Sequence, residues 1–337
     1  MSAEIKEYKK SDFVSTQEVR WCPGCGDYSI LAAVQMTMPK IGKKKEDICF
    51  VSGIGCSSRF PYYMNTYGMH TIHGRAAAIA SGLKVQNPNL SVWVATGDGD
   101  ALAIGGNHMI HLLRRNLDIN VIMFNNEIYG LTKGQYSPTT KKGSTSKSSP
   151  YGSIDRHFTP AALTLGAGAT FYARCIDTDP KHLGKILEEA AAHKGTAFVE
   201  VYQNCVIYTN KLHDPYTGRQ TRDENTIKLE HGKPMIFGKN KDKGLVLDGL
   251  SPKVVMIGEN GITEKDLIVH DETDHNEAFM LSNMKFPDLP VPLGIFRKVE
   301  ESVYEVDHDL QIEEITKLKG KGTMNDLLNS GNTWDVK

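Results

Sequence analysis

Runs of apolar, often β-branched residues alternate along the chain with segments of helical spacing. The runs have the length of buried strands, and the segments between them are rich in good helix formers. Because strand and helix alternate, the pattern predicts an α/β fold with a parallel sheet covered by helices on both faces. The expected strands are Ile48–Ile54, Ser91–Ala95, Ile119–Phe124 and Ala197–Tyr202, and the expected helices are Tyr28–Met38, Ala76–Val85, Ala101–Arg115 and Lys181–Ala192.

Three of the expected strands run into polar turns, two of them rich in glycine or aspartate. The turns are Gly53-Ile54-Gly55-Cys56-Ser57-Ser58, Gly97-Asp98-Gly99-Asp100 and Asn125-Asn126-Glu127. In open α/β sheets, ligands bind at the carboxyl ends of the strands. We therefore expect all three turns to face one crevice.

The character of the chain changes after about Asn210, where long polar and Lys/Gly-rich stretches begin. We expect a main domain at residues 1–212 and a smaller C-terminal extension or arm at residues 213–337, frayed past Leu318. Within the main domain, Thr139–Pro150 is rich in Ser, Thr, Lys and Gly and is expected to form a mobile loop.

Composition narrows the class of protein. The chain has 337 residues and a formal net charge of -1, which gives no electrostatic case for binding nucleic acid or a membrane surface. No apolar run approaches the roughly 18 residues that span a bilayer. Met1–Lys10 is polar, so no secretory signal is expected. Six cysteines are too few for a disulfide scaffold, and a cytoplasmic location is expected.

The turn Gly97-Asp98-Gly99-Asp100 predicts a site for a diphosphate and a metal ion. Asn125-Asn126 follows the next strand, about 26 residues later. Glycines let backbone N–H groups approach a diphosphate, and a helix that starts there favours its negative charge. Asp98 and Asn126 offer the hard oxygen ligands that Mg²⁺ takes. The alternative is a tight turn with an N-capping Asp and an unrelated Asn pair.

Four cysteines form a second constellation. Cys22-Pro23-Gly24-Cys25 places two thiols on one tight turn, Cys56 lies in a glycine turn, and Cys205 follows another strand. Four thiolates can hold a [4Fe–4S] cluster or a tetrahedral zinc ion, and the spacing leaves both open. Cys49 and Cys175 lie within apolar runs and are expected to be core residues.

Several segments together resemble the β subunit of 2-oxoacid:ferredoxin oxidoreductases. The segments are WCPGCGDY, GIGCSSRFPYY, HGRA, GDGDALAIGGNH, NNEIYGLTKGQYSPT and a late QNC, and they extend from Val19 to Tyr208. GDGD followed by NN is similar to the signature shared by thiamine diphosphate enzymes. Within the family, GCSSRFPYYMNTYG and YGLTKGQYSPT most resemble the 2-oxoglutarate enzymes, with pyruvate or a broad range of 2-oxoacids as the alternative.

The resemblance implies CoA-dependent oxidative decarboxylation of 2-oxoglutarate to succinyl-CoA and CO₂, or the reverse carboxylation, with electrons leaving through a [4Fe–4S] cluster to ferredoxin. It implies the thiamine diphosphate-binding fold, with Mg²⁺ held by Asp98, Asn126 and the carbonyl of Ile128. The implied cluster ligands are Cys22, Cys25, Cys56 and Cys205. The residues expected to hold or border thiamine diphosphate are Gly55, Cys56, Ser57, Ser58, His73, Gly97, Asp98, Gly99, Asp100, Asn126, Ile128, Gly130, Leu131 and Thr132.

A few residues are candidates for handling the substrate. By resemblance, Ser57, Ser58 and His73 are catalytic candidates near the cofactor. Arg59 and Lys133 could orient a substrate carboxylate, because a cation pairs with it. The alternatives are that the serines cap a helix, that His73 only begins one, and that both cations are solvated.

The chain contains only one copy of the expected βα module. In the family, the pyrimidine-binding half of the thiamine site, with its activating glutamate, lies on a separate α subunit. The resemblance therefore implies an obligate hetero-oligomer, αβ or (αβ)₂, whose active site is shared between chains. Residues 213–337 would cover the cluster or contact that partner.

Two other functions fit parts of the sequence. A non-catalytic binding subunit could use the cysteines for zinc or for a stabilising cluster, with no cofactor at the GDG turn. A non-redox thiamine lyase would use the GDGD turn but would have no role for four cysteine ligands.

Overall fold

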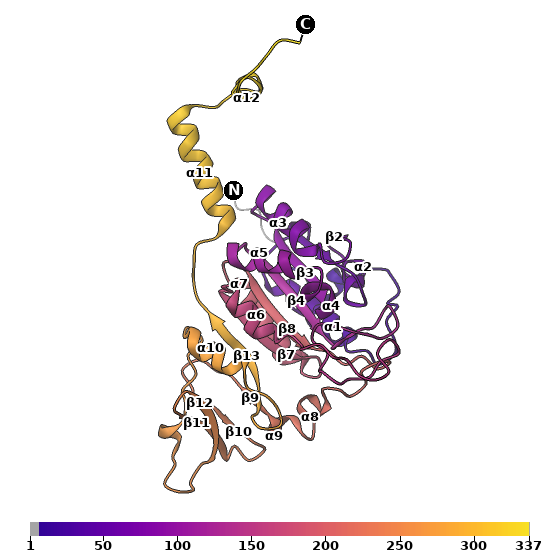
Figure 1. The fold of residues 1–337 in the computed structure, drawn as a ribbon, viewed down its shortest axis with the longest axis vertical. Helices are drawn as coiled ribbons and strands as arrows, with labels where there is room; N and C mark the ends of the chain where they lie inside the picture. The colour runs from indigo at the N-terminus through magenta and orange to yellow at the C-terminus, as the bar shows by residue number, and fades with distance from the viewer. Residues whose placement is uncertain (1–6, 337) are drawn as a thin grey trace.

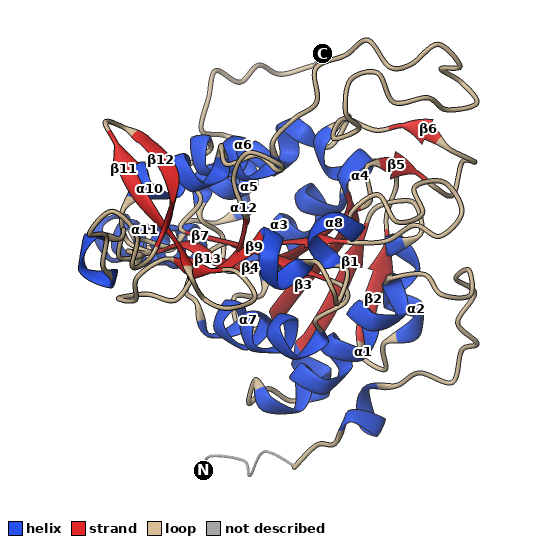
Figure 2. Cartoon of the chain, turned by 90° about the horizontal axis from the view of Figure 1, so that it is seen from below, coloured by secondary structure: helices blue, strands red, loops and turns tan. Residues whose placement is uncertain are grey.

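A computed structural model describes residues 7–336 of the protein, which are built around an eight-stranded sheet (Figures 1 and 2). The first six residues of the polar stretch Met1–Lys10 lie outside the described residues. The first six strands in spatial order are parallel to one another, whereas the seventh, β13, runs antiparallel to its neighbour β7. In spatial order the strands are β2 (Tyr67–His70), β1 (Ile48–Ser52), β3 (Ser91–Gly97), β4 (Ile119–Asn125), β8 (Ala197–Tyr202), β7 (Phe171–Ile176), β13 (Val291–Lys298) and β9 (Thr226–Lys228).

Helices cover both faces of this sheet, as the alternation of strand and helix predicts. Along a strand, successive side chains point to opposite faces. Val51 and Val94 therefore belong to one core, and Phe50 and Trp93 belong to the other. The first core packs against α3 (Ala76–Gln86), α5 (Gly106–Arg115), α6 (Pro160–Gly166) and α10 (His275–Ser282), and the second against α1 (Asp27–Thr37), α2 (Phe60–Tyr63) and α7 (Pro180–Ala192).

The prediction of one continuous helix at Ala101–Arg115 was wrong. The structure has a single turn, α4 (Asp98–Leu102), and then α5, with a break between them. The reason is close backbone packing at the break: a Cβ on Gly105 would lie 2.4 Å from the carbonyl oxygen of Asp100. The other expected helices and strands are present, with ends that differ by a few residues.

The region after residue 212 is partly integrated into the main body. Strands β9 and β13 complete the large sheet, and α10 packs on one of its faces. The rest forms a small antiparallel sheet beside it (Figure 1). That sheet consists of β10 (Ile236–Phe237), β11 (Lys243–Asp248) and β12 (Ser251–Met256), and two short helices precede it, α8 (Asp214–Thr217) and α9 (Arg222–Asn225).

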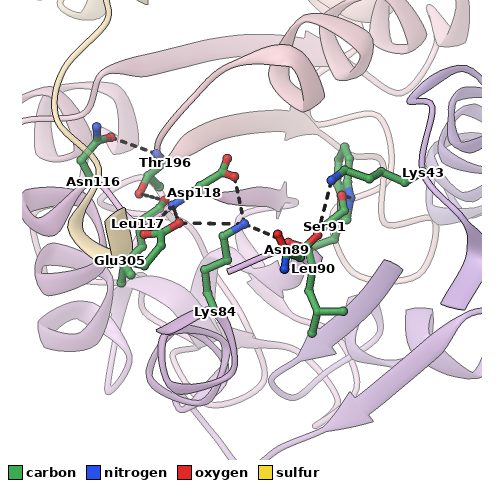
Figure 3. Close-up of polar contacts among 11 residues, drawn as sticks. Lys43, Lys84, Asn89, Leu90, Ser91, Asn116, Leu117, Asp118, Thr196 and Glu305 are labelled. Atoms are coloured by element: carbon green, nitrogen blue, oxygen red, sulfur yellow. Dashed lines mark hydrogen bonds and ion pairs between the residues drawn. The ribbon is translucent and has the colours of Figure 1, made fainter. Parts of the chain in front are cut away.

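A C-terminal arm, residues 304–336, projects from the body (Figure 1). It contains α11 (Tyr304–Lys319) and α12 (Met324–Leu328), and every residue from Asp309 to Val336 is exposed. Its base is fixed by a buried charge cluster in which the Lys84 ammonium donates to Asp118 at 2.9 Å and lies 3.9 Å from a Glu305 carboxylate oxygen (Figure 3). Neither this arm nor another helix in residues 7–336 is long and apolar enough to cross a membrane.

Candidate active site

A crevice lies at the carboxyl ends of β3 and β4, where the three polar turns meet. It contains nearly all of the residues expected to hold thiamine diphosphate; Ser58 and His73 are the exceptions. The residues that line it are Asp27, Ile54, Gly55, Cys56, Ser57, Gly97, Asp98, Gly99, Asp100, Phe124, Asn126, Ile128, Tyr129, Gly130, Leu131 and Thr132.

Asp98 is a buried carboxylate at the floor of this crevice. Its Oδ2 accepts hydrogen bonds from the hydroxyls of Ser137 and Thr139. Burial raises the pKa of Asp98 to about 6, although these hydroxyl donors lower it. The loop expected to be mobile at Thr139–Pro150 is thus held at its start, where Thr139 and Thr140 are buried. A bound cation would offset the cost of keeping this carboxylate ionised.

The two asparagines of the NN pair have different partners. Asn126 Nδ2 donates to Gln203 Oε1 at 2.8 Å, while its Oδ1 accepts from the N–H of Ile128 at 3.2 Å. Asn125 instead donates to the buried carboxylate of Glu200 at 2.7 Å, and its Oδ1 lies 3.0 Å from the Thr139 hydroxyl oxygen. Asn126 therefore faces the crevice, and Asn125 ties the strand end to the sheet.

Gly99 is required by a close contact. A Cβ at this position would lie 2.4 Å from Cε1 of Tyr129, whose hydroxyl donates to the Gly99 carbonyl at 2.7 Å. A second strand pair follows the NN turn, β5 (Ile128–Tyr129) with β6 (Gln135–Tyr136), and holds Tyr129 over the GDGD turn.

Asp100 lines the crevice, but its carboxylate is used within the protein. Oδ1 accepts from the N–H of Gly74 at 2.7 Å and lies 2.9 Å from His73 Nδ1, while Oδ2 accepts from Thr96 at 2.8 Å. A Cβ on Gly53 would overlap this carboxylate at 1.6 Å. Asp100 thus anchors the His73 loop to the GDGD turn, and His73 sits beside the crevice rather than in its lining.

A second cavity holds the four cysteines that the sequence singles out. Cys22, Cys25, Cys56 and Cys205 all line it, whereas Cys49 and Cys175 are buried in the core as expected. The two cavities have four lining residues in common, Cys56, Asn126, Gly130 and Leu131.

Gly130 lines both cavities and has no side chain that would fill either of them. A Cβ at this position would lie 3.7 Å from the Sγ atoms of both Cys56 and Cys205. Two thiols from distant parts of the chain therefore converge on one glycine. Among residues 7–336, no three His, Cys, Asp or Glu side chains are close enough together to hold a single metal ion.

Burial dominates the electrostatics of the cysteine cavity. It raises the pKa of the Cys56 thiol to about 12 and, with the nearby Asp27 carboxylate, also raises the pKa of Cys25. The Arg59 guanidinium acts in the opposite direction on Cys56. Asp27 is itself fully buried, with its pKa raised to about 7 by burial, and its Oδ2 has no hydrogen-bond partner among the described residues.

The four remaining candidates, two serines and two cations, differ in their position relative to the two cavities. Ser58 is fully buried and its hydroxyl has no hydrogen-bond partner among residues 7–336, whereas Ser57 lines the crevice. Arg59 lines the cysteine cavity and donates to the carbonyl of Arg20 at 2.9 Å. Lys133 is exposed and lines neither of the two cavities.

Sequence reasoning missed several residues of the site. Tyr129 and Gln203 lie inside the segments NNEIYG and QNC, so the sequence contained a signal for them, but it did not reveal which residues they contact. Ser137 and Thr139 stood in or beside a segment interpreted as a loop, and only the folded chain brings their hydroxyls to Asp98.

Comparisons with known proteins place the chain in a family. Residues 53–201 match the family model for the thiamine pyrophosphate enzyme C-terminal TPP-binding domain. The chain is 47% identical to 2-oxoglutarate oxidoreductase subunit KorB of Mycobacterium tuberculosis, over 97% of this chain and 88% of that protein. It is 43% identical to 2-oxoglutarate synthase subunit KorB of Archaeoglobus fulgidus, over 61% of this chain and 75% of that protein.

A solved structure covers the whole architecture. It is titled 2-oxoglutarate:ferredoxin oxidoreductase from Magnetococcus marinus with 2-oxoglutarate, coenzyme A and succinyl-CoA bound. It matches with a TM-score of 0.76 and 30% identity, over 98% of each chain. The fold, the thiamine-binding domain and the sequence identity agree, and the chain belongs to the family of β subunits of 2-oxoglutarate and other 2-oxoacid:ferredoxin oxidoreductases.

Proposed function

We propose that this chain forms half of the active site of a thiamine diphosphate-dependent 2-oxoglutarate:ferredoxin oxidoreductase. The reaction converts 2-oxoglutarate and CoA to succinyl-CoA and CO₂ while ferredoxin is reduced, or runs in reverse. One observation carries the proposal: the crevice that fits a diphosphate cofactor and the cavity lined by four cysteines share a wall. A redox enzyme needs its electron acceptor beside its carbon chemistry, whereas a thiamine lyase does not.

The crevice residues fit a Mg²⁺–diphosphate group. Asp98 and Asn126 would bind Mg²⁺ through their side chains and Ile128 through its carbonyl, a sparse oxygen set that phosphate and water complete. Gly97 and Gly99 let the backbone approach the diphosphate. The orientation of the Asn126 amide supports this role, because Gln203 holds its nitrogen and leaves the oxygen facing the N–H of Ile128 and the crevice.

The cysteine cavity fits a [4Fe–4S] cluster. Cys22, Cys25, Cys56 and Cys205 would each donate a thiolate, and the iron charge would oppose the raised pKa of the buried thiols. When bound, thiamine diphosphate supplies the carbanion chemistry that 2-oxoacid decarboxylation needs, and the cluster supplies one-electron acceptance.

Residues of this chain would also position the substrate. Ser57 lines the crevice and is the better placed of the two serines to meet a substrate. Of the two cations, Arg59 stands at the cysteine cavity, whereas Lys133 would have to move to reach either site. His73 is oriented by Asp100 at the edge of the crevice and could hold a proton there.

Partner chains complete the proposal. An α subunit would bring the pyrimidine-binding domain and its glutamate to the crevice, in an αβ or (αβ)₂ complex in the cytoplasm, and ferredoxin would dock near the cysteine cavity. None of the described residues 213–336 lines that cavity. Residues 213–337 would either cover the cluster from outside this lining or contact a partner. The exposed C-terminal arm offers the surface for such a contact.

Anaerobic co-purification of the native complex tests the proposal. We expect brown protein whose visible absorbance falls on adding dithionite, and viologen reduction that depends on CoA and is faster with 2-oxoglutarate than with pyruvate or branched 2-oxoacids. Colourless protein with stoichiometric zinc would favour the non-catalytic alternative. Turnover of 2-oxoacids without viologen reduction would favour a lyase.

A further inference from the structure

One buried glutamine, Gln203, lines the cysteine cavity and contacts a predicted ligand of each site, Asn126 and Cys25. It is 1% exposed and follows directly after β8. Its Oε1 accepts from Asn126 Nδ2 at 2.8 Å, on the magnesium side. Its Nε2 donates to Cys25 Sγ at 3.2 Å, on the cysteine side. A single planar amide therefore joins the two sites.

The orientation of this amide is fixed by the backbone. Gln203 Nε2 also donates to the carbonyl of Asn204 at 2.7 Å, and a carbonyl can only accept. The nitrogen must face that carbonyl, so Oε1 must face Asn126. Asn126 then has to present its own nitrogen to Gln203, which leaves Oδ1 on the side of Ile128. The backbone carbonyl of Asn204 thus determines which atom of Asn126 is free to bind a cation.

The same backbone carbonyl also positions the cysteine turn. The N–H of Gly26 donates to the Asn204 carbonyl at 3.2 Å, and the N–H of Asn204 donates to Asp177 at 2.8 Å. A Cβ on Gly26 would lie 1.9 Å from an Asp177 carboxylate oxygen, so this turn is packed directly against its support. Cys25 and Gln203 are therefore held in register by shared contacts.

We propose that Gln203 is a positioning residue that couples the two sites. It orients Asn126 for the metal and donates a hydrogen bond to the sulfur of Cys25. This proposal rests on the proposed function, because it assumes a cation at Asn126 and a cluster at Cys25. Partners that orient a metal ligand commonly change metal affinity about 10- to 100-fold when they are removed. Hydrogen bonds to cluster sulfurs stabilise the reduced state, which raises the reduction potential.

The test is Gln203→Met in the native complex, because methionine has a similar volume and makes neither hydrogen bond. We expect Mg²⁺-dependent thiamine diphosphate binding, measured by calorimetry, to weaken about 10- to 100-fold. We also expect the cluster midpoint potential, measured by redox titration with electron paramagnetic resonance, to become more negative. Gln203→Glu keeps an acceptor for Asn126 and removes the donor, so it should lower the potential while cofactor affinity stays closer to that of the wild type.

Gln35→Met is the matched control. Gln35 is also buried and donates from Nε2 to a backbone carbonyl, that of Tyr63 at 3.1 Å, but it lines neither cavity. It should lower the free energy of unfolding without moving cofactor affinity or potential. A folded Gln203→Met complex with wild-type affinity and wild-type potential would overturn the coupling. Wild-type protein that lacks a cluster or does not bind thiamine diphosphate would overturn the proposed function instead.

Discussion

Replacing Lys84 with methionine removes the cation that pairs with Asp118 and Glu305 in the buried charge cluster of Figure 3. The Lys84 and Glu305 side chains are 3% and 2% exposed, so Glu305 would be left buried without its counter-charge. Breaking a buried ion pair by removing one partner costs about 3–5 kcal/mol. Asp118 is 25% exposed and its N–H still donates to Glu305 at 3.1 Å, so we expect a loss near the lower end, about 3 kcal/mol.

This loss should depend on pH. Burial raises the pKa of Glu305 in the folded protein, while Lys84 lowers it. Without Lys84, the folded pKa rises further above the unfolded value. A carboxyl group of this kind costs nothing below its unfolded pKa and costs more as the pH rises towards its folded pKa. The variant should therefore be closest to wild type in acid, near pH 5, and furthest from it near pH 8.

Guanidinium unfolding followed by circular dichroism at both pH values measures the effect. Lys40→Met is the matched control, because Lys40 pairs with Glu188 at 2.6 Å with both side chains well exposed. Exposed pairs contribute only about 0–1 kcal/mol, so the control should change little. A loss below about 1 kcal/mol in Lys84→Met, or one that does not vary with pH, would contradict the assignment of a buried, charge-balanced cluster.

Three further outcomes follow from the site. Asp98→Ala should abolish Mg²⁺-dependent thiamine diphosphate binding in calorimetry; unchanged affinity would contradict the metal assignment. Gly99→Ala should cost about 1–3 kcal/mol in denaturant unfolding, because the new Cβ would press on the ring of Tyr129 at 2.4 Å. Cys205→Ala should remove the visible absorbance and viologen reduction, whereas Cys175→Ala, a core change, should keep both and lower only the unfolding free energy; equal losses in the two variants would refute the four-cysteine set.

Much of the lining of the crevice could be predicted because its sequence signals are local. A strand followed at once by GDGD or NN places those residues at a sheet edge, and both turns line the crevice. Ser137 and Thr139 lie at the end of the segment NNEIYGLTKGQYSPT, but their contact with Asp98 could not be predicted, because this polar sequence has no period of its own. Their role depends on how that segment folds back over the strand ends.

The outer strands escaped prediction for a physical reason. β13 contains Pro292 and Gly294, residues that usually mark loops, and the preceding stretch is rich in proline. Its place next to β7 follows from antiparallel pairing between segments far apart in the chain, which no local pattern encodes. The break before α5 has a partly similar origin, since a Cβ on Gly105 would lie 3.0 Å from Cα of Gly74, which belongs to a distant segment of the chain.

The position of Gly130 determines at which stage a substitution there would become detectable. An alanine there would place its methyl group 3.7 Å from the sulfurs of Cys56 and Cys205, an ordinary contact distance while the cavity holds nothing else. The empty chain should fold and resist denaturant as the wild type does. If the proposed cluster occupies the cavity, the lost space matters only when inorganic sulfur and iron have to share it. The substitution would then have no effect on the newly made polypeptide and would first show as a failure of cluster insertion.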